Sequence, residues 1–251
     1  MTVHLGTPRD WLRETHQLDL SHPKIHITSL KLTQSLHGLR ERACAIHDFV
    51  RRLPFGAFSD VSHVRASDVL RANHGDCHSK GVLFVALCRS AGIPARLNFL
   101  RIHPRFLHGI LDEGPDTMAH AVGQVLIDGQ WVGTDAYVVD PVLYAQAKHR
   151  LRQESGDCGW GIVSDAQALW NGVDDRFHQF RASDVVHNYG AYDDPAEFYA
   201  ELSHDEGAPS WVARLKYALG AQLVNRRVAR LRETRPVGEE VRPADQLQRS
   251  R

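Results

Sequence analysis

Cys77 stands at the start of an apolar run and has the surroundings of a reactive thiol. It follows a Gly-Asp turn, and the chain is apolar from Val82 to Cys88. Gly92 and Pro94 supply the stop signal of a helix, which predicts a buried helix with Cys77 in its first turn. The unpaired N–H groups and the positive dipole end at a helix start stabilise a thiolate. Cys77 is therefore a candidate nucleophile, although a lone cysteine at such a place is more often an inert, small apolar residue.

A histidine and an aspartate are predicted to meet on the clearest hairpin of the sequence, residues 119–139. Its Asp128-Gly129 turn is typical of a two-residue type I′ loop. The register set by such a loop places His120 and Asp135 on one face, about 7–8 Å apart at the backbone. A carboxylate beside an imidazole fixes its tautomer and stabilises the imidazolium, which is how a base that activates a nucleophile is held. The alternative is an exposed His–Asp pair on a sheet edge, which stabilises little.

The elements that must position these three residues follow from hydrophobic periodicity and turn residues. Residues 96–102 are predicted to form a strand before the hairpin. Helices are predicted over residues 35–52, 66–72, 77–91, 142–153, 164–171, 195–202 and 210–233. The apolar side of the last helix is predicted to consist of Trp211, Leu215, Ala218, Leu219 and Leu223.

The order and context of these residues resemble the transglutaminase-like superfamily of papain-like thiol enzymes, in its stand-alone microbial type. The resemblance covers roughly residues 36–141, and the matching stretches are Gly-Asp-Cys-His-Ser-Lys-Gly, His-Ala-Val-Gly-Gln-Val and Gly-Gln-Trp-Val-Gly-Thr-Asp. It implies an α+β fold with a papain-like, transglutaminase-like core. In such a core a buried helix that begins with the cysteine packs on an antiparallel sheet, and extra helices follow at the C-terminal side. The chain departs from the family at Ala121, where an aromatic residue is common.

By this resemblance Cys77 is the nucleophile, His120 the base and then the acid, and Asp135 the residue that orients His120. The implied activity is that of a thiol-dependent amide hydrolase or acyltransferase, a protease, amidase or transglutaminase-type enzyme that forms an acyl-thioenzyme. Its substrate would be a peptide, a protein or a small-molecule amide. The backbone N–H of Cys77 is one expected oxyanion donor, and Asn73 or His74 is a candidate for the second. The alternative is an inactive module that binds a peptide or partner protein.

Composition restricts the remaining possibilities. The chain has 30 basic and 30 acidic residues, so neither a nucleic acid nor a membrane is an expected partner. The spacing of the four cysteines does not suggest a disulfide framework. The sequence shows no recognisable signal peptide or membrane span. We therefore expect a cytoplasmic protein with reduced thiols. The 16 histidines are scattered, so no metal and no cofactor are expected. A metal hydrolase that uses His74, Cys77, His78 or His120 stays open as a minor alternative. Calcium dependence is not expected, since no calcium-loop pattern occurs. The oligomeric state is not predictable.

We expect one domain with four parts. Residues 1–34 pack on the core, 35–141 form the catalytic core, 142–233 form a helical and loop extension, and 234–251 form a charged, disordered tail. The extension holds several aromatic residues beside glycine-rich loops, among them Trp160, which we assign to substrate binding. The alternative is that these aromatic residues form a satellite core.

Overall fold

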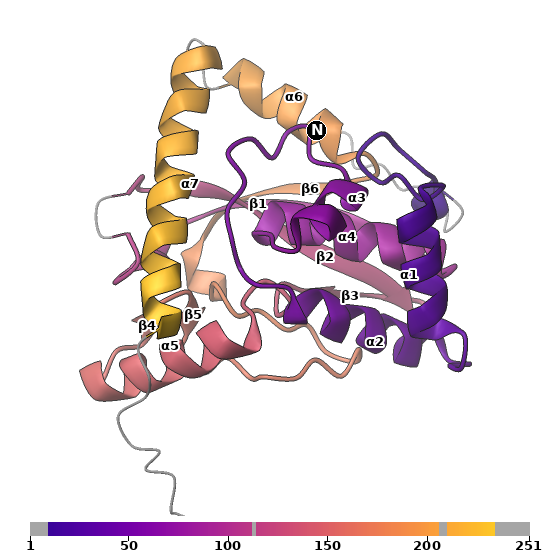
Figure 1. Cartoon of the computed structure of the whole chain (residues 1–251), viewed down its shortest axis with the longest axis horizontal. Coiled ribbons are helices and arrows are strands. Elements are labelled where there is room, and N and C mark those ends of the chain that lie inside the picture. Colours follow the sequence, from indigo (N-terminus) through magenta and orange to yellow (C-terminus); the bar gives the residue numbers. More distant parts are fainter. Residues whose placement is uncertain (1–9, 112–113, 206–209, 234–251) are drawn as a thin grey trace, which may run out of the picture.

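The computed structural model describes residues 10–111, 114–205 and 210–233. Helices surround a four-stranded antiparallel sheet, so the fold is α+β, as predicted (Figure 1). The helices are α1 Pro23–Thr33, α2 Leu39–Arg52, α3 Ala66–Ala72, α4 Cys77–Ser90, α5 Pro141–Glu154, α6 Pro195–Asp205 and α7 Ser210–Glu233. The strands are β1 Ala95–Ile102, β2 Met118–Ile127, β3 Gln130–Thr134, β6 Val185–Tyr192 and the short pair β4 Cys158–Gly159 and β5 Ile162–Val163. Within the described residues, no helix has the length and apolar character needed to cross a membrane.

The main sheet has the strand order β3-β2-β1-β6. Ile127 pairs with Gln130 across the two-residue turn, and the same register continues to the pair Gly123 and Thr134, as the turn residues predict. The hairpin is shorter than the predicted residues 119–139, because β3 ends at Thr134 and the chain turns, with the Val138 N–H donating to the Asp135 carbonyl. The strand β6, which the sequence did not reveal, pairs with the free edge of β1.

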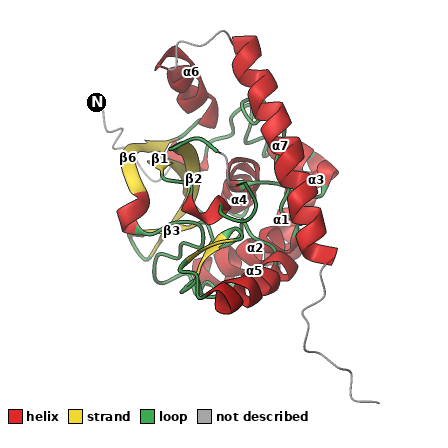
Figure 2. Ribbon diagram, turned by 90° about the vertical axis from the view of Figure 1, so that its left-hand side faces the viewer, coloured by secondary structure: helices red, strands yellow, loops and turns green. Residues whose placement is uncertain are grey.

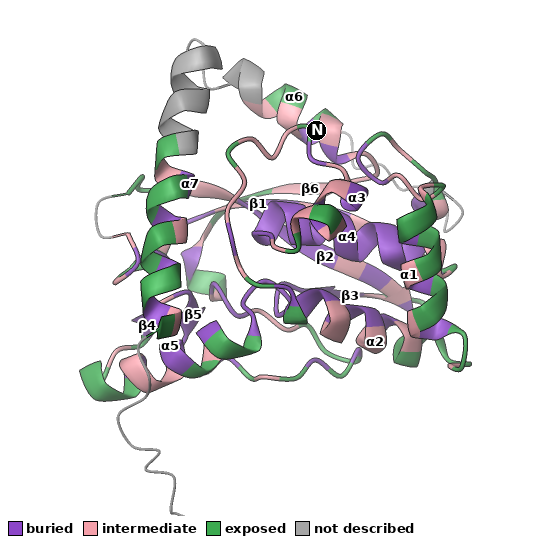
Figure 3. Ribbon diagram, in the orientation of Figure 1, coloured by how far each residue is buried: buried purple, intermediate pink, exposed green. Residues whose placement is uncertain are grey.

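The central helix α4 has strong local reasons to begin where it does. The Asp76 side chain accepts from the backbone N–H of Ser79, and the Ser79 hydroxyl lies 2.8 Å from the backbone nitrogen of Asp76, which completes a capping box. The left-handed Gly92, with φ of 77°, follows its end. Every residue from 77 to 89 is buried (Figure 3), because α4 lies between the sheet and the helices α1 and α3 (Figure 2). The predicted buried helix is therefore present.

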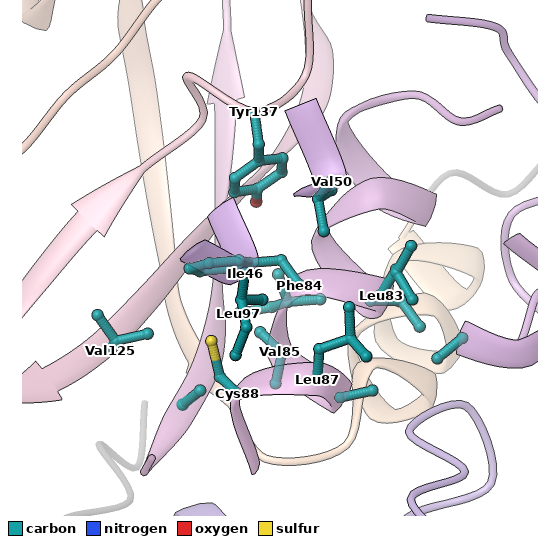
Figure 4. Packing of buried hydrophobic residues seen from close by; sticks show 14 of the residues in the cluster. Ile46, Val50, Leu83, Phe84, Val85, Leu87, Cys88, Leu97, Val125 and Tyr137 are labelled. Atoms are coloured by element: carbon teal, nitrogen blue, oxygen red, sulfur yellow. The ribbon is translucent and has the colours of Figure 1, made fainter. Parts of the chain in front are cut away.

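Side chains of α4 form the middle of the main core (Figure 4). Phe84 stacks on Tyr137 with ring centroids 4.9 Å apart, and Ile46 and Val50 of α2 pack in the same cluster. The sheet approaches closely at Gly123, where an added Cβ would lie 2.6 Å from the Phe84 ring. The helix and β2 can therefore pack this closely only because residue 123 has no side chain.

The N-terminal part contributes a helix, α1, which is not among the helices that the sequence predicts. Ile25 is fully buried, and the Ser29 hydroxyl donates to the Leu87 carbonyl of α4 at 3.0 Å. Pro23 occupies the first turn and the His22 side chain caps the helix by accepting from the Lys24 N–H. α1 thus packs on α4 and α2.

Two predictions about the C-terminal half are wrong. The predicted helix 164–171 is absent, because Trp170 turns into the core beside Phe84 and donates to the Asp174 carbonyl instead. In α7, Leu219 and Leu223 are exposed, and the buried stripe among the described side chains is Ala221, Val224, Val228 and Leu231, whereas the side chains of Trp211, Leu215 and Ala218 lie outside those described. The predicted tail 234–251 lies outside the described residues.

Candidate active site

Cys77 is the first residue of α4 and follows the capping residue Asp76. Its side chain is buried, with the residue only 6% exposed. Burial by itself would raise the pKa of the thiol, but the charges of His78 and His120 outweigh it and lower the pKa to about 6. The helix start, which the sequence predicted, favours the same ionised form. The local setting is that of a thiolate at neutral pH.

His120 and Asp135 meet as the hairpin register predicts. The His120 Nε2 and the Asp135 Oδ2 atoms are 3.0 Å apart, and both residues are fully buried. Burial would lower the pKa of His120, but the charge of Cys77 and the hydrogen bond to Asp135 raise it to about 10. Asp135 lies at Nε2, and the other ring nitrogen, Nδ1, is buried and has no hydrogen-bond partner among the described atoms. The three side chains therefore form a coupled group.

The turn after β3, which carries Asp135, is held by two sets of hydrogen bonds that the sequence did not indicate. The backbone N–H groups of His178 and Gln179 donate to the Asp135 carboxylate, the latter at 3.4 Å. Lys80 of α4, which is fully buried, donates to the carbonyls of Val138 and Tyr137 at 2.8 and 3.1 Å and also to Leu53 at 2.6 Å. Burial lowers the pKa of Lys80 to about 7. These contacts fix the turn that carries the carboxylate.

A second histidine, His78, lies beside the thiol. Its Nε2 is 3.2 Å from the Ala119 carbonyl, and its Nδ1 is 2.8 Å from the Tyr199 hydroxyl. Burial would lower the pKa of His78, and the charge of Cys77 raises it. Because Ala119 precedes His120, His78 ties the start of α4 to the strand that carries the base. The sequence shows only its adjacency to Cys77, and Tyr199 could not be paired with it.

Aromatic rings close the His120 side of the group. The Phe180 ring centroid lies 5.3 Å from that of His120. The Phe106 ring, from the segment between β1 and β2, lies 6.3 Å from the His120 ring. Phe177 stacks on Phe180 at 4.8 Å. Apolar walls exclude water and strengthen the attraction between imidazolium and thiolate. The aromatic segment of the extension thus contributes walls to the site.

Asn73 and His74, the candidates for the second oxyanion donor, lie on the segment that leads to Cys77. Asn73 ends α3 in a left-handed conformation with φ of 55°. The His74 ring stacks on Phe58 with centroids 5.0 Å apart, and its Nδ1 is 3.0 Å from the Ala72 carbonyl. These contacts place both residues near the helix start without directing either side chain to the thiol. Their role stays a prediction.

Trp160 and Cys158 lie elsewhere. The Trp160 Nε1 atom donates to Glu154 at 2.8 Å, its ring lies under Arg150, and a Cβ on Gly109 would touch it. None of its described contacts involves the triad, so its assignment to substrate binding stays a prediction. Cys158, which shares the Gly-Asp-Cys context of Cys77, lies in β4, and burial raises its pKa to about 11. Among the described residues, no three His, Cys, Asp or Glu side chains converge to bind a metal.

Residues 28–136, somewhat less than half of the chain, match the family model of the transglutaminase-like superfamily. This confirms the resemblance that the motifs predicted. No curated protein matches the sequence.

Two solved structures are similar in part. A "Putative Cysteine Protease" from Cytophaga hutchinsonii has 22% sequence identity and a TM-score of 0.43, over 55% of this chain and 44% of that chain. A "Putative Protease" from Parabacteroides distasonis has 16% identity and a TM-score of 0.35, over 50% of this chain and 26% of that one. The chain therefore spans less than half of the length of either protein.

Proposed function

Because residues 28–136 match the transglutaminase-like superfamily, we propose that the chain is a cysteine-nucleophile amide hydrolase or acyltransferase that forms an acyl-thioenzyme. One observation supports this proposal most directly. A buried His120–Asp135 pair lies beside a thiol at a helix start, and the pKa of that thiol is lowered to about 6. Such a group is costly to bury, and it has the parts that nucleophilic catalysis needs.

The reaction would proceed in two stages. The Cys77 thiolate attacks the carbonyl carbon of an amide, and the carbonyl electron pair moves to the oxygen, which the Cys77 backbone N–H stabilises. The His120 imidazolium then gives the proton on Nδ1 to the leaving amine as the C–N bond breaks, leaving the acyl group on sulfur. In the second stage, water or another amine attacks this thioester while His120 takes its proton, and the Cys77 thiolate is released. Asp135 holds the ring with Nδ1 toward the sulfur throughout.

The test is the order in which the cysteines react. Intact-mass analysis after limited iodoacetamide treatment at pH 7, followed by peptide mapping, should find Cys77 modified first, since the other thiols have raised pKa values. The variant Cys77→Ala should lose this fast phase and all turnover of an activated acyl ester while staying folded. Cys158→Ala is the matched control, and loss of activity in that variant alone would contradict the assignment.

A second function, an inactive module that binds a peptide or a partner, is favoured by one observation: the thiol is 6% exposed and its two partners are fully buried. The two functions differ in one measurement. An enzyme releases a burst of product equal to the enzyme concentration when it is mixed with an activated ester, and a binding module releases none. Insensitivity of this burst to chelators, with loss on alkylation, would exclude the metal hydrolase.

A further inference from the structure

Cys77 is 6% exposed and His120 and Asp135 are fully buried, so other segments must cover them. Two segments are candidates for this cover: the loop between α2 and α3, which contacts the residues before Cys77, and the helix α7, which contacts that loop. In Figure 1 this loop runs between α4 and α7. The contacts of each segment show which one belongs to the site permanently and which one could be exchanged for a substrate.

The loop is tied by its backbone to the residues that lead to Cys77. The Gly56 N–H donates to the Gly75 carbonyl at 3.0 Å, and the Gly75 N–H donates to the Pro54 carbonyl at 3.1 Å. The Phe58 N–H donates to the carboxylate of Asp76, at 3.1 Å. Gly75 is two residues from the nucleophile, at most about 7 Å of extended chain. The inner edge of the loop is therefore a fixed part of the nucleophile's surroundings.

The outer edge of the same loop is bound by a side chain. The Ala57 N–H donates to Asn225 Oδ1 at 2.7 Å, and the Asn225 amide nitrogen donates to the Ala57 carbonyl at 2.9 Å. Both backbone groups of one residue are thus paired with one carboxamide. An extended peptide would offer the same donor and acceptor to Ala57, as in an antiparallel strand pair.

Other contacts of α7 explain how it closes the site. The Arg232 side chain donates to the Phe55 carbonyl at 3.0 Å and forms an ion pair with Asp140. Val224 and Val228 are buried in the same apolar cluster as Phe106, whose ring flanks His120. The helix therefore holds the loop edge and belongs to the apolar cluster that includes Phe106.

We propose that Ala57 is a main-chain subsite for an extended peptide substrate and that Asn225 of α7 occupies it in this structure. The substrate class is then a peptide or protein segment rather than a small amide. Binding of that segment requires this part of α7 to withdraw, so α7 regulates access to Cys77. This inference rests on the proposed function, because it assumes that substrate approaches the Cys77 thiol.

The first test uses hydrogen exchange of the full-length protein with an N-acetyl tetrapeptide aldehyde, which forms a reversible thiohemiacetal with a reactive thiol. In the parent, the aldehyde should speed exchange of the amides around residue 225 while the Ala57 amide stays protected. In Asn225→Ala, the Ala57 amide should exchange fast in the free protein and become protected again with the aldehyde. Iodoacetamide, which has no peptide backbone beyond one amide, should give no such protection.

The second test is affinity. Removing the competing side chain should tighten binding of the same aldehyde about tenfold, the size expected for the loss of two competing hydrogen bonds. Gln222→Ala, which removes an exposed amide side chain of the same helix, should bind like the parent. Parent-like affinity of Asn225→Ala, with the Ala57 amide exchanging freely beside the bound aldehyde, would show that Asn225 is only a structural brace. An aldehyde that leaves Cys77 unmodified would instead refute the proposed function itself.

Discussion

Replacing Asp135 by asparagine should reverse the tautomer of His120 while keeping the shape of the site. One carboxylate oxygen accepts from the His178 backbone N–H, and the other accepts from His120 and from the Gln179 N–H. Asparagine has a single oxygen, and the shorter of the two backbone hydrogen bonds, from the His178 N–H at 2.5 Å rather than from the Gln179 N–H at 3.4 Å, selects its position. The amide NH₂ then faces His120 Nε2, which has to become an acceptor. The neutral ring then carries its one proton on Nδ1 and cannot accept the thiol proton there.

The size of the effect follows from the pKa values. With the carboxylate charge gone, the imidazolium form of His120 is less stable, and the pKa of Cys77 rises above about 6, although the charge of His78 still lowers it. For a rise of about one unit, the thiolate fraction at pH 7 falls from about nine-tenths to about one-half, so alkylation of Cys77 should slow at least about twofold. Turnover should fall further, by roughly 10⁴-fold in kcat, as the same substitution does in a serine triad.

The assay is the rate of Cys77 alkylation by iodoacetamide from pH 5 to 9, followed by mass spectrometry. The parent should show an inflection near pH 6, and Asp135→Asn should show it at least one pH unit higher. The control is Asp128→Asn at the exposed hairpin turn, which should leave the profile unchanged.

Coincident profiles for parent and Asp135→Asn would refute the reasoning. The Asp135 carboxylate would then have no influence on the ion pair between the His120 imidazolium and the Cys77 thiolate. Asp140 could not replace it in this structure, because its oxygens are bound by the N–H groups of Phe55 and Leu143 and by Arg232.

Three further outcomes are expected. Burial lowers the pKa of His178 to about 4, below its unfolded value. The neutral His178 therefore contributes fully to stability above about pH 6.5, and this contribution is lost as the pH falls toward 4. Urea denaturation should show that the free energy of unfolding falls by up to about 3 kcal/mol over this range, and His178→Gln should abolish this pH dependence. Lys80→Met should cost about 3 kcal/mol in the same assay, because three buried carbonyls lose their donor, whereas the exposed Lys24→Met should cost little. Gly123→Ala should lower the free energy of unfolding by about 1–3 kcal/mol through its clash with the Phe84 ring, and a variant as stable as the parent would contradict the packing.

Elements with local signals could be predicted from the sequence. α4 has its cap, its apolar run and its glycine stop within a few residues of one another. The Asp128-Gly129 turn fixed the hairpin register, and through it the meeting of His120 with Asp135. These features depend on neighbours in the chain, which explains why they could be inferred without a structure.

Elements that depend on distant partners could not be predicted. β6 has no clean alternation because it is an edge strand, and only the free edge of β1 makes it a strand. α1 was missed since two of its three buried positions are polar, Ser29 and Thr33. The tertiary environment also overrode the helical pattern near Trp170.

The residues that hold His78 and Asp135 in place could not be predicted for the same reason. The backbone donors to Asp135 come from residues 178 and 179, and the hydroxyl on His78 comes from Tyr199, 121 positions along the chain. No spacing rule connects such residues. The positions of Cys77, His120 and Asp135 were therefore predictable, and the groups that hold them in place were not.

The placement of β1 between β2 and β6 has a consequence for biosynthesis. A nascent chain that has reached Asp135 lacks the two backbone donors for that carboxylate, and Phe99 lacks Phe198, which stacks on it at 3.9 Å. At about 5–20 residues per second, the ribosome needs roughly 3–12 s to supply the residues up to 198. During that interval one edge of β1 has no partner strand, and the Asp135 carboxylate that binds His120 is not yet held in place. The surroundings of the thiol are therefore completed late, after the sheet has closed, and a half-made chain carries Cys77, His78 and His120 without the later residues that hold them in place.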